Sequence, residues 1–452
     1  MFIGRDAELG ELEQLHAESG FRFAEVTGAP GIGKTALLRE FCRNKRAVMF
    51  SAVRADRMHN LVAMSRAVSK SMYRGLRRLV SFASFEDAFT FICKLSERER
   101  VVLVIDNYDF FRISDDPVSD AMRVRMFADR NIMLVISGNG DLEEGRRFPE
   151  PPEKVELGPL RFSEVRNAYD ENYTDEDLLT LFSVTGGYPD YLRHFDPAVP
   201  LRQGIIDCFL QSDGPLYRPP LERTSIRNPE TYNCILSAMG DRMVQMGEIT
   251  ESSGVGSSAA CSTYLSALVS ERVAEKLHPF GEAGSRRSLY RISDPVARFW
   301  YSFIEDNQSI VDFSDDLDIY QSIIGDGMEH FLQATFREVC LQFMRENSAF
   351  FDMRPGRTGM WWGHDSTRSM GRIDIVAESD DMTQTMFCDC RFRDSPVGMS
   401  VLDGLREKSR KVRSAGVSRY ALFSKNGFTQ ELLDYAEEND VTLVTLRDIC
   451  WY

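Results

Sequence analysis

The segment GAPGIGKT at residues 28–35 has the residue types and the spacing that bind the phosphates of a nucleotide. Its pattern is GxxxxGK[ST]: the glycines let the backbone curl so that N–H groups point at the phosphates, and the following helix N-terminus adds partial positive charge. Lys34 is expected to reach the outer phosphates, and Thr35 to place its hydroxyl on Mg²⁺. ATP or ADP with Mg²⁺ is therefore the expected ligand. The predicted binding residues are Gly28, Pro30, Gly31, Ile32, Gly33, Lys34 and Thr35.

An acidic residue follows the apolar run Val101–Ile105. This residue, Asp106, is expected to hold Mg²⁺ through water. The next residue is Asn107, where hydrolytic P-loop proteins usually carry glutamate, and an amide cannot accept a proton from the attacking water. Asp109 would replace that base only if its loop turns inward. We therefore predict nucleotide binding with slow hydrolysis, and Lys34, Asp106 and Asp109 are the candidate catalytic residues.

Short apolar segments must position these residues at one edge of a parallel sheet. Strands are predicted at Phe21–Thr27, Ala47–Ala52, Val101–Ile105 and Ile132–Ile136, and a helix at Ala36–Cys42. The fourth strand leads into Asn139, which is either a polar sensor of the outer phosphate or part of a tight turn. Further along, Arg146 and Arg147 are candidates for a charge-stabilising arginine, and solvated surface arginines are an equally favoured interpretation.

Length and charge limit the other functions. The chain has 452 residues, a formal net charge of −15 and 43% hydrophobic residues, so two to four domains with ample cores are expected. The acidic balance argues against a nucleic-acid coat or a membrane-surface protein, although a local basic patch is compatible with it. We find no signal segment and no apolar run of about eighteen residues, and we expect a cytoplasmic protein without a membrane partner. The nine scattered cysteines are expected to be reduced, mostly buried thiols.

The order of the motifs resembles that of archaeal-type ATPases in the STAND group of AAA-like P-loop proteins. It begins with Phe2-Ile3-Gly4-Arg5 and Glu8-Leu9, continues through the P-loop and the Asp106 strand, and ends in Leu157–Leu160 and Gly186–Pro189. The resemblance implies that Arg5 lies against the adenine and that Pro189 belongs to a helical lid over the nucleotide. It also implies an α/β fold, with a P-loop (RecA/AAA-like) parallel sheet in residues 1–155 and the lid in residues 156–215.

A proline- and arginine-rich linker, residues 215–229, precedes a region that resembles the winged helix-turn-helix of the same family. This domain is expected at residues 216–307, with a second helix at Ser257–Val269 and a two-stranded wing within Arg272–Ile292. The second helix lacks the Arg, Asn, Gln and Lys side chains that usually read bases. Packing against protein is therefore favoured over DNA contact. The candidate phosphate contacts in the wing are Arg286, Arg287 and Arg291.

Residues 308–452 resemble the C-terminal domain of these ATPases, whose α/β core is similar to PD-(D/E)xK, restriction-endonuclease-like nucleases. The resemblance rests on Gly371–Val376, Phe387–Arg391 and Tyr420–Phe428. It implies that Asp374 and Asp389 occupy the carboxylate places that hold Mg²⁺ on adjacent strands.

Two departures from the nuclease pattern argue against cleavage. Arg391 stands where the family has lysine, and it stays charged and cannot act as a base. Relatives show Phe-Glu in the preceding helix, whereas this chain has Phe336-Arg337 and then Glu338, which is expected on a different side of the helix. Lys408 is the candidate for the missing amine. A nuclease-like fold kept for packing or for holding nucleic acid is favoured over an active enzyme.

Three functions are therefore considered. The leading hypothesis is an ATP-binding switch that couples its nucleotide state to the winged helix and the nuclease-like domain, with an unknown protein partner. The second is an ATP-regulated, Mg²⁺-dependent nuclease acting on DNA or RNA in a defence or mobile-element setting. The third is a DNA-binding regulator that uses the wing. A divalent metal at Asp374 and Asp389, with a lysine nearby, would favour the nuclease.

Overall fold

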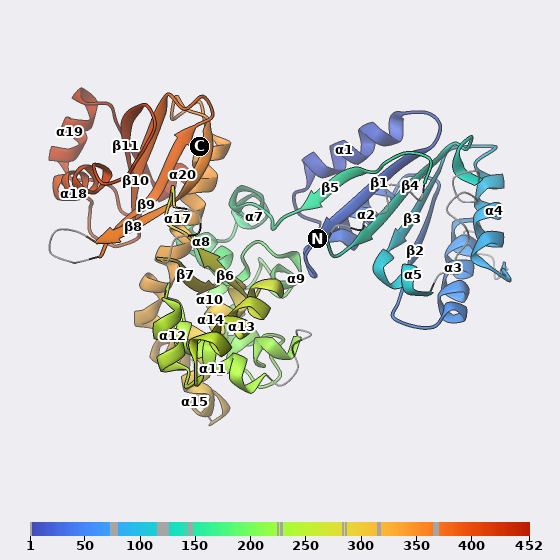
Figure 1. The fold of residues 1–452 in the computed structure, drawn as a ribbon, viewed down its shortest axis with the longest axis horizontal. Coiled ribbons are helices and arrows are strands. Elements are labelled where there is room, and N and C mark those ends of the chain that lie inside the picture. Colours follow the sequence, from blue (N-terminus) through green and yellow to red (C-terminus); the bar gives the residue numbers. More distant parts are fainter. Residues whose placement is uncertain are drawn as a thin grey trace. The chain divides into compact units, whose positions relative to one another are not determined.

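The structure is a computed structural model that describes residues 2–72, 80–114, 126–140, 142, 148–223, 226, 229–282, 284, 287–313, 318–364 and 370–452. It divides into two compact units. The first comprises Met1–Leu160 together with Tyr188–Asp190, and the second comprises Arg161–Gly187 together with Tyr191–Tyr452. Each unit contains a β-sheet with helices packed against it (Figure 1).

The first unit is built on a five-stranded parallel sheet with the strand order β2-β3-β4-β1-β5. Its strands are β1 (Arg22–Gly28), β2 (Ala47–Ser51), β3 (Val101–Asp106), β4 (Ile132–Gly138) and β5 (Glu153–Leu157). Its helices are α1 (Asp6–Ala17), α2 (Lys34–Phe41), α3 (Arg57–Met72), α4 (Phe85–Leu95) and α5 (Tyr108–Ser114).

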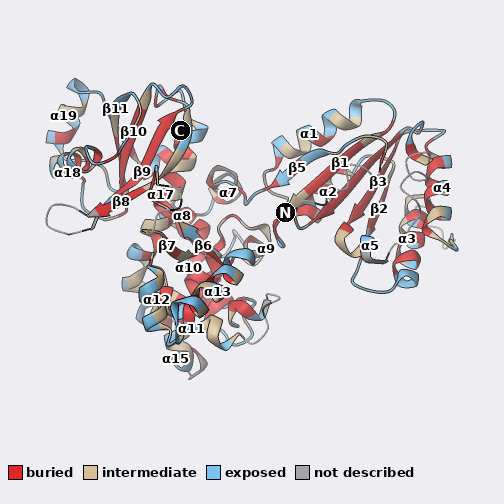
Figure 2. Cartoon of the chain, viewed as in Figure 1, coloured by how far each residue is buried: buried red, intermediate tan, exposed pale blue. Residues whose placement is uncertain are grey.

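Side chains that alternate along the strands divide the core of this unit into two layers. On β3, Leu103 and Ile105 pack in the cluster that includes α3 and α4, whereas Val102 and Val104 pack in the cluster that includes α1 and α2. Because helices cover both faces, β3 and β4 are buried along their whole length (Figure 2). The carboxyl ends of β1, β3 and β4 therefore bring the P-loop, Asp106 and Asn139 to one edge.

The second unit begins with helices. These are α7 (Phe162–Tyr169), α8 (Asp175–Thr185), α9 (Pro189–Leu192), whose first two residues belong to the first unit, and α10 (Leu201–Phe209). Three further helices and an antiparallel pair of strands lie where the winged helix-turn-helix was predicted, and the pair is called the wing below. These elements are α11 (Glu230–Met239), α12 (Met246–Ser252), α13 (Ser258–Ser270), β6 (Ala274–Leu277) and β7 (Leu289–Ile292). The connecting helices are α14 (Pro295–Phe299), α15 (Gln308–Phe313), α16 (Asp318–Ile323) and α17 (Met328–Glu346).

A second five-stranded sheet, in the order β12-β11-β10-β9-β8, completes the second unit. β8, β9 and β10 pair antiparallel, whereas β10, β11 and β12 pair in parallel. On one face α18 and α19 add Leu402, Leu405 and Leu432 to a cluster around Phe387. On the other face the α17 residue Met344 contacts Cys388 of β10 through sulfur, at 3.7 Å. The elements are β8 (Pro355–His364), β9 (Met370–Ser379), β10 (Gln384–Arg391), α18 (Met399–Ser409), β11 (Val417–Ser424), α19 (Gln430–Glu438), β12 (Val441–Thr445) and α20 (Leu446–Trp451).

The predicted fold class, a P-loop parallel sheet followed by a separate C-terminal α/β sheet, is confirmed. β5 was not predicted; it pairs with β1 and extends the first sheet past residue 155 to Leu157. The proposed boundaries after residues 155, 215 and 307 stay predictions. Arg146, Arg147 and Arg286 lie outside the described residues. Within the described ranges, no helix is long and apolar enough to cross a membrane.

Candidate functional site

The backbone conformation and close packing of the P-loop require glycine at three of its positions. Gly31 and Gly33 have φ values of +76° and +96°, in the left-handed region that other residues avoid. A Cβ on Gly28 would stand 2.7 Å from the carbonyl oxygen of Leu157, and one on Gly31 would stand 2.9 Å from Cβ of Asp190. The loop is therefore closed in by β5 on one side and by Tyr188–Asp190 on the other, and α2 begins directly after it at Lys34.

Lys34 lies along the inner surface of the loop. Its Nζ donates to the carbonyl oxygens of Gly28 at 2.8 Å and Ala29 at 3.0 Å, and to Oδ1 of Asn139 at 2.8 Å. The Asn139 side chain, at the end of β4, is thus in hydrogen-bond contact with the P-loop lysine. The two interpretations of Asn139, sensor or turn residue, remain predictions, and this contact supports the sensor.

Asp106 is the centre of a hydroxyl cluster at the edge of the sheet. Its buried carboxylate accepts hydrogen bonds from Thr35 Oγ1 at 2.8 Å, from Ser51 Oγ at 3.1 Å and from Ser137 Oγ at 2.5 Å. A hydroxyl from the P-loop and a carboxylate from the neighbouring strand form the oxygen pair that Mg²⁺ uses beside nucleotide phosphates, so these residues fit that metal. Ser51 was not predicted, because only strand pairing places the end of β2 beside Asp106.

Asn107 and Asp109 follow Asp106 and face different partners. Asn107 has φ +55°, and its Nδ2 donates to the carbonyl oxygen of Ala52 at 3.2 Å. Asparagine tolerates this left-handed geometry better than glutamate does. The carboxylate of Asp109 accepts the backbone N–H of Asn139 at 3.0 Å. Asp109 therefore turns toward the end of β4, beside the residue that binds Lys34, and its catalytic role stays a prediction.

Arg5 supports the loop from outside. Its φ is +70°, and its guanidinium donates to the carbonyl oxygens of Ile32 at 3.1 Å and Gly158 at 2.6 Å and pairs with Glu8 at 2.9 Å. The side chain is buried, so Arg5 ties the N-terminal segment to the P-loop in addition to its predicted position near adenine.

Pro189 lies against the P-loop within the first unit. A Cβ on Gly33 would stand 3.3 Å from Cγ of Pro189, and the N–H of Asp190 donates to the carbonyl oxygen of Gly31 at 3.2 Å. These contacts agree with a position at the nucleotide site, and the lid role of Pro189 stays a prediction.

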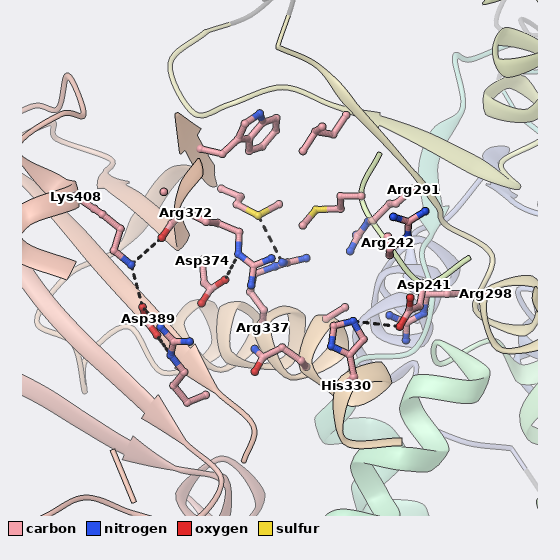
Figure 3. A pocket seen from close by; sticks show the side chains of 18 residues that line it. Asp241, Arg242, Arg291, Arg298, His330, Arg337, Arg372, Asp374, Asp389 and Lys408 are labelled. Atoms are coloured by element: carbon pink, nitrogen blue, oxygen red, sulfur yellow. Dashed lines mark hydrogen bonds and ion pairs between the residues drawn. The ribbon is translucent and has the colours of Figure 1, made fainter. Parts of the chain in front are cut away.

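A second cluster of charged side chains lies in the second unit, on the inner strands β9 and β10 of its five-stranded sheet. Asp374 on β9 and Asp389 on β10 are both buried and line one cavity (Figure 3). Arg372 Nε lies 3.1 Å from Oδ1 of Asp374, and Arg391 Nε lies 2.5 Å from Oδ1 of Asp389. Burial and the neighbouring Asp374 charge raise the pKa of Asp389 from its ordinary value, while Arg391 opposes this shift.

Lys408 reaches this cluster from α18. Its Nζ lies 3.5 Å from Oδ2 of Asp389 and donates to the carbonyl oxygen of Arg372 at 3.0 Å. The structure thus places the amine suggested for the site near one of the two carboxylates, although Lys408 is distant from both in sequence. Arg337, from α17, also lines the cavity and is buried.

The wing arginines are engaged by carboxylates. Arg291 on β7 pairs with Glu275 on β6 and Glu338 on α17, each at 2.5 Å, and Arg287 pairs with Glu282. Burial works against the charge of Arg291, but the two glutamates raise its pKa. Its proposed phosphate contact stays a prediction, and these ion pairs weigh against it.

Two parts of the chain match known protein families. Residues 1–135 match a family described as an AAA ATPase domain, and residues 300–410 match a family described as archaeal and bacterial proteins of unknown function. An uncharacterised protein of Methanocaldococcus jannaschii is 21% identical over 467 residues, which cover 99% of this chain and 100% of that protein. The first unit thus contains an AAA ATPase domain, as the motif order predicted.

Solved structures show more distant similarity. A Walker-type ATPase of Pyrococcus abyssi has 15% identity and a TM-score of 0.45, covering 66% of this chain and 96% of that chain. A STAND protein of Pyrococcus horikoshii with a tetratricopeptide repeat sensor has 14% identity and a TM-score of 0.31, covering 78% of this chain and 52% of that chain. These similarities are too low to support an argument about this chain.

Proposed function

We propose that this protein is a switch that binds ATP with Mg²⁺ at its P-loop, hydrolyses it slowly, and passes the nucleotide state to its second unit. The observation that carries the proposal is the cluster formed by Lys34, Thr35 and Asp106, in which Thr35 Oγ1 lies 2.8 Å from the Asp106 carboxylate. Thr35 and Asp106 would hold Mg²⁺, and the metal would supply charge compensation between the outer phosphates. Lys34 would exchange its loop carbonyl partners for phosphate oxygens.

The path of the chain supports the proposal that the nucleotide state is passed from the P-loop to the second unit. Tyr188–Asp190 belong to the first unit, whereas Arg161–Gly187 before them and the chain from Tyr191 onward belong to the second unit. The Asp190 N–H is bonded to the Gly31 carbonyl oxygen, so a change in the P-loop backbone acts on a segment joined covalently to the second unit at both ends. Coupling between the nucleotide site and the second unit requires a connecting element that can adopt two arrangements, one of them favoured by bound nucleotide.

Slow hydrolysis follows from the residues that surround Asp106. Asn107 directs its amide to Ala52 and offers no base, and Asp109 is occupied by the backbone of Asn139. A long-lived ATP state suits a switch better than a motor, because the signal then lasts as long as the bound nucleotide.

For the C-terminal domain we propose a nuclease-like fold without nuclease chemistry. Asp374 and Asp389 are each matched by an arginine within 3.1 Å, and among the described residues no group of three His, Cys, Asp or Glu side chains could hold a metal ion. The side chains that surround the two carboxylates therefore do not fit Mg²⁺. One observation favours the rival nuclease, namely the 3.5 Å approach of Lys408 to Asp389.

Calorimetry with ATP and Mg²⁺ tests the switch at its first step. Lys34→Ala should abolish binding, whereas Lys70→Ala, which removes an exposed lysine of α3, should leave it unchanged. Hydrogen exchange should then show that ATP alters protection in α8, α9 and α10 of the unmodified protein and not of Lys34→Ala. Protection changes confined to the first unit would contradict the switch.

Nuclease chemistry is tested with single- and double-stranded DNA and RNA, with Mg²⁺ or Mn²⁺, in the presence and absence of ATP. We expect no cleavage. Cleavage that disappears in both Asp374→Ala and Lys408→Ala would establish the rival function. A sequence-specific footprint without cleavage would instead support the DNA-binding regulator.

A further inference from the structure

The cavity beside Asp374 and Asp389 has a volume of about 530 Å³ and an excess of positive charge. Seven arginine and lysine side chains line it against three aspartates, in a chain whose formal net charge is −15. Five of the seven have an acidic partner within 3.5 Å. The other two, Arg298 and Arg337, have no ion pair with any carboxylate in the part of the chain that the structure describes.

Of these two arginines, Arg337 has the weaker hydrogen-bond acceptor. It is 8% exposed, and among the described residues its guanidinium donates only to the sulfur of Met360, at 3.5 Å. In Figure 3 this side chain lies between the Arg372–Asp374 pair and the His330–Asp241 pair. Burial lowers the pKa of Arg337, and the nearby charge of Arg291 adds to this effect, whereas the charges of Asp374 and Glu338 oppose it. A guanidinium in such a place is stabilised by a bound anion.

Arg298 provides a second cation on the same cavity. It is also 8% exposed, donates to Thr335 Oγ1 at 2.7 Å and lies with its guanidinium carbon 4.1 Å from the ring centre of Phe331. Burial lowers the pKa of Arg298 to about 10, so it remains charged at neutral pH. Arg337 and Arg298 thus place two charges in one cavity, and neither forms a direct ion pair with a carboxylate among the described residues.

The rest of the cavity indicates the size and character of the anion. Met243, Leu289 and Met360 give part of its lining an apolar character, and most of the other lining residues are charged. A volume of about 530 Å³ falls within the range of roughly 300–1,000 Å³ typical of small-molecule sites. Arginine forks match the geometry of phosphate oxygens, and an apolar wall suits a base and sugar. A mononucleotide has both parts.

We propose that this cavity binds the phosphate of a mononucleotide without a divalent cation, with Arg337 as the principal counter-charge and Arg298 as the second. In this proposal the guanidinium of Arg337 supplies the positive charge on the phosphate that Mg²⁺ supplies in a nuclease. The site lies in the second unit and is separate from the P-loop of the first unit.

The test uses the full chain carrying Lys34→Ala, in EDTA, so that the P-loop does not contribute. Titration with adenosine 5′-monophosphate in a calorimeter should show saturable binding. Arg337→Met, which keeps the length of the side chain and removes its charge, should weaken that binding at least tenfold. The matched control is Arg345→Met, which removes an exposed arginine from the same helix α17 and should leave the affinity unchanged.

Several outcomes would overturn the proposal. These are equal affinity in Arg337→Met and its parent, binding that appears only when Mg²⁺ is added, and binding of a 5′-phosphorylated oligonucleotide with none of the monophosphate. Arg337→Lys should recover part of the affinity, which distinguishes a charge contact from a packing role. Thermal melting of each variant should show a folded protein, because an apolar side chain of similar length replaces a buried charge that forms no direct ion pair among the described residues. Loss of ATP binding at the P-loop would contradict the switch and leave this result untouched.

Discussion

The Nζ of Lys34 donates a hydrogen bond to Oδ1 of Asn139 at 2.8 Å, joining the P-loop to the end of β4. The two residues are far apart in sequence and are brought together by the parallel pairing of β1 with β4. The backbone N–H of Asn139 is held in turn by the carboxylate of Asp109. The lysine that would bind the outer phosphates is therefore connected to two polar groups beyond its own loop.

This connection predicts a role for Asn139 in distinguishing ATP from ADP. Asn139→Ala should lower the affinity for ATP with Mg²⁺ by about threefold to tenfold, the loss expected for one hydrogen bond, and change ADP affinity less. Calorimetric dissociation constants for both nucleotides give the ratio directly. An equal loss for ATP and ADP would assign Asn139 to the turn alone.

Hydrolysis by the unmodified protein should fall well below the ~10 s⁻¹ typical of enzymes, because Asn107 offers no base. Asn107→Glu should raise the rate of phosphate release. It should also lower the free energy of unfolding by about 1 kcal/mol, because glutamate takes a left-handed conformation less readily than asparagine. Phosphate release and thermal melting measure the two effects. Fast release by the unmodified protein, lost in Asp109→Asn, would show that Asp109 is the base.

Glu338 should make the stability of the second unit dependent on pH. Burial opposes its ionisation, but Arg291, Arg298 and Arg337 outweigh it and lower the pKa of Glu338 from its ordinary value of 4.5. A carboxyl with a lowered pKa in the folded state stabilises the fold above pH 4.5, and this contribution is lost as the pH falls through the folded value.

Glu338→Gln should therefore cost about 1 kcal/mol at pH 7, a modest figure because 44% of the Glu338 side chain is exposed and solvent screens the pair. The difference from the unmodified protein should shrink as the pH is lowered below 4.5. Denaturant titrations at several pH values measure it, with Glu329→Gln on the exposed side of α17 as the control. A difference that does not depend on pH would rule out this ion pair as its source.

Thiol labelling of the folded protein should be selective. Burial raises the pKa of Cys42 and of Cys93 to about 11, and that of Cys208 to about 12, so their reactive thiolates are scarce at pH 8. Cys234 is the exposed cysteine. Mass spectrometry after brief maleimide treatment should find one fast label, absent in Cys234→Ser, whereas the denatured chain should take nine. A second fast label on the folded protein would contradict this selectivity, because the other thiols are buried or, at Cys42, half-buried.

The parts of the fold that are determined by residues close together in the sequence were predictable. The P-loop, the strand before Asp106 and the helix after Thr35 are each encoded within a short segment, where spacing alone specifies the backbone. β5 was missed because its five residues, EKVEL, bury only two side chains and lack the apolar run of β3 and β4.

The contacts that depend on tertiary pairing were harder to predict. Ser51 joins the Asp106 cluster only because β2 pairs with β3, and the partners of Arg291 and Arg337 come from other elements. One sequence read by itself does not indicate which residues from distant elements contact each other. Glu338 was expected to face away from the nuclease-like site, but its partner, the wing residue Arg291, became evident only in the fold.

The wing and the C-terminal sheet are bound together more closely than their sequence resemblances suggest. The Phe280 N–H donates to the Met360 carbonyl oxygen on β8 at 2.8 Å, the Trp362 indole donates to the Arg287 carbonyl oxygen at 2.8 Å, and Phe280 packs in the core cluster of that sheet. A fragment that starts near residue 308 would lose these partners, expose the apolar surface they cover and leave Glu338 without Arg291. We therefore expect the wing and the sheet to fold as one piece, and limited proteolysis should release them together.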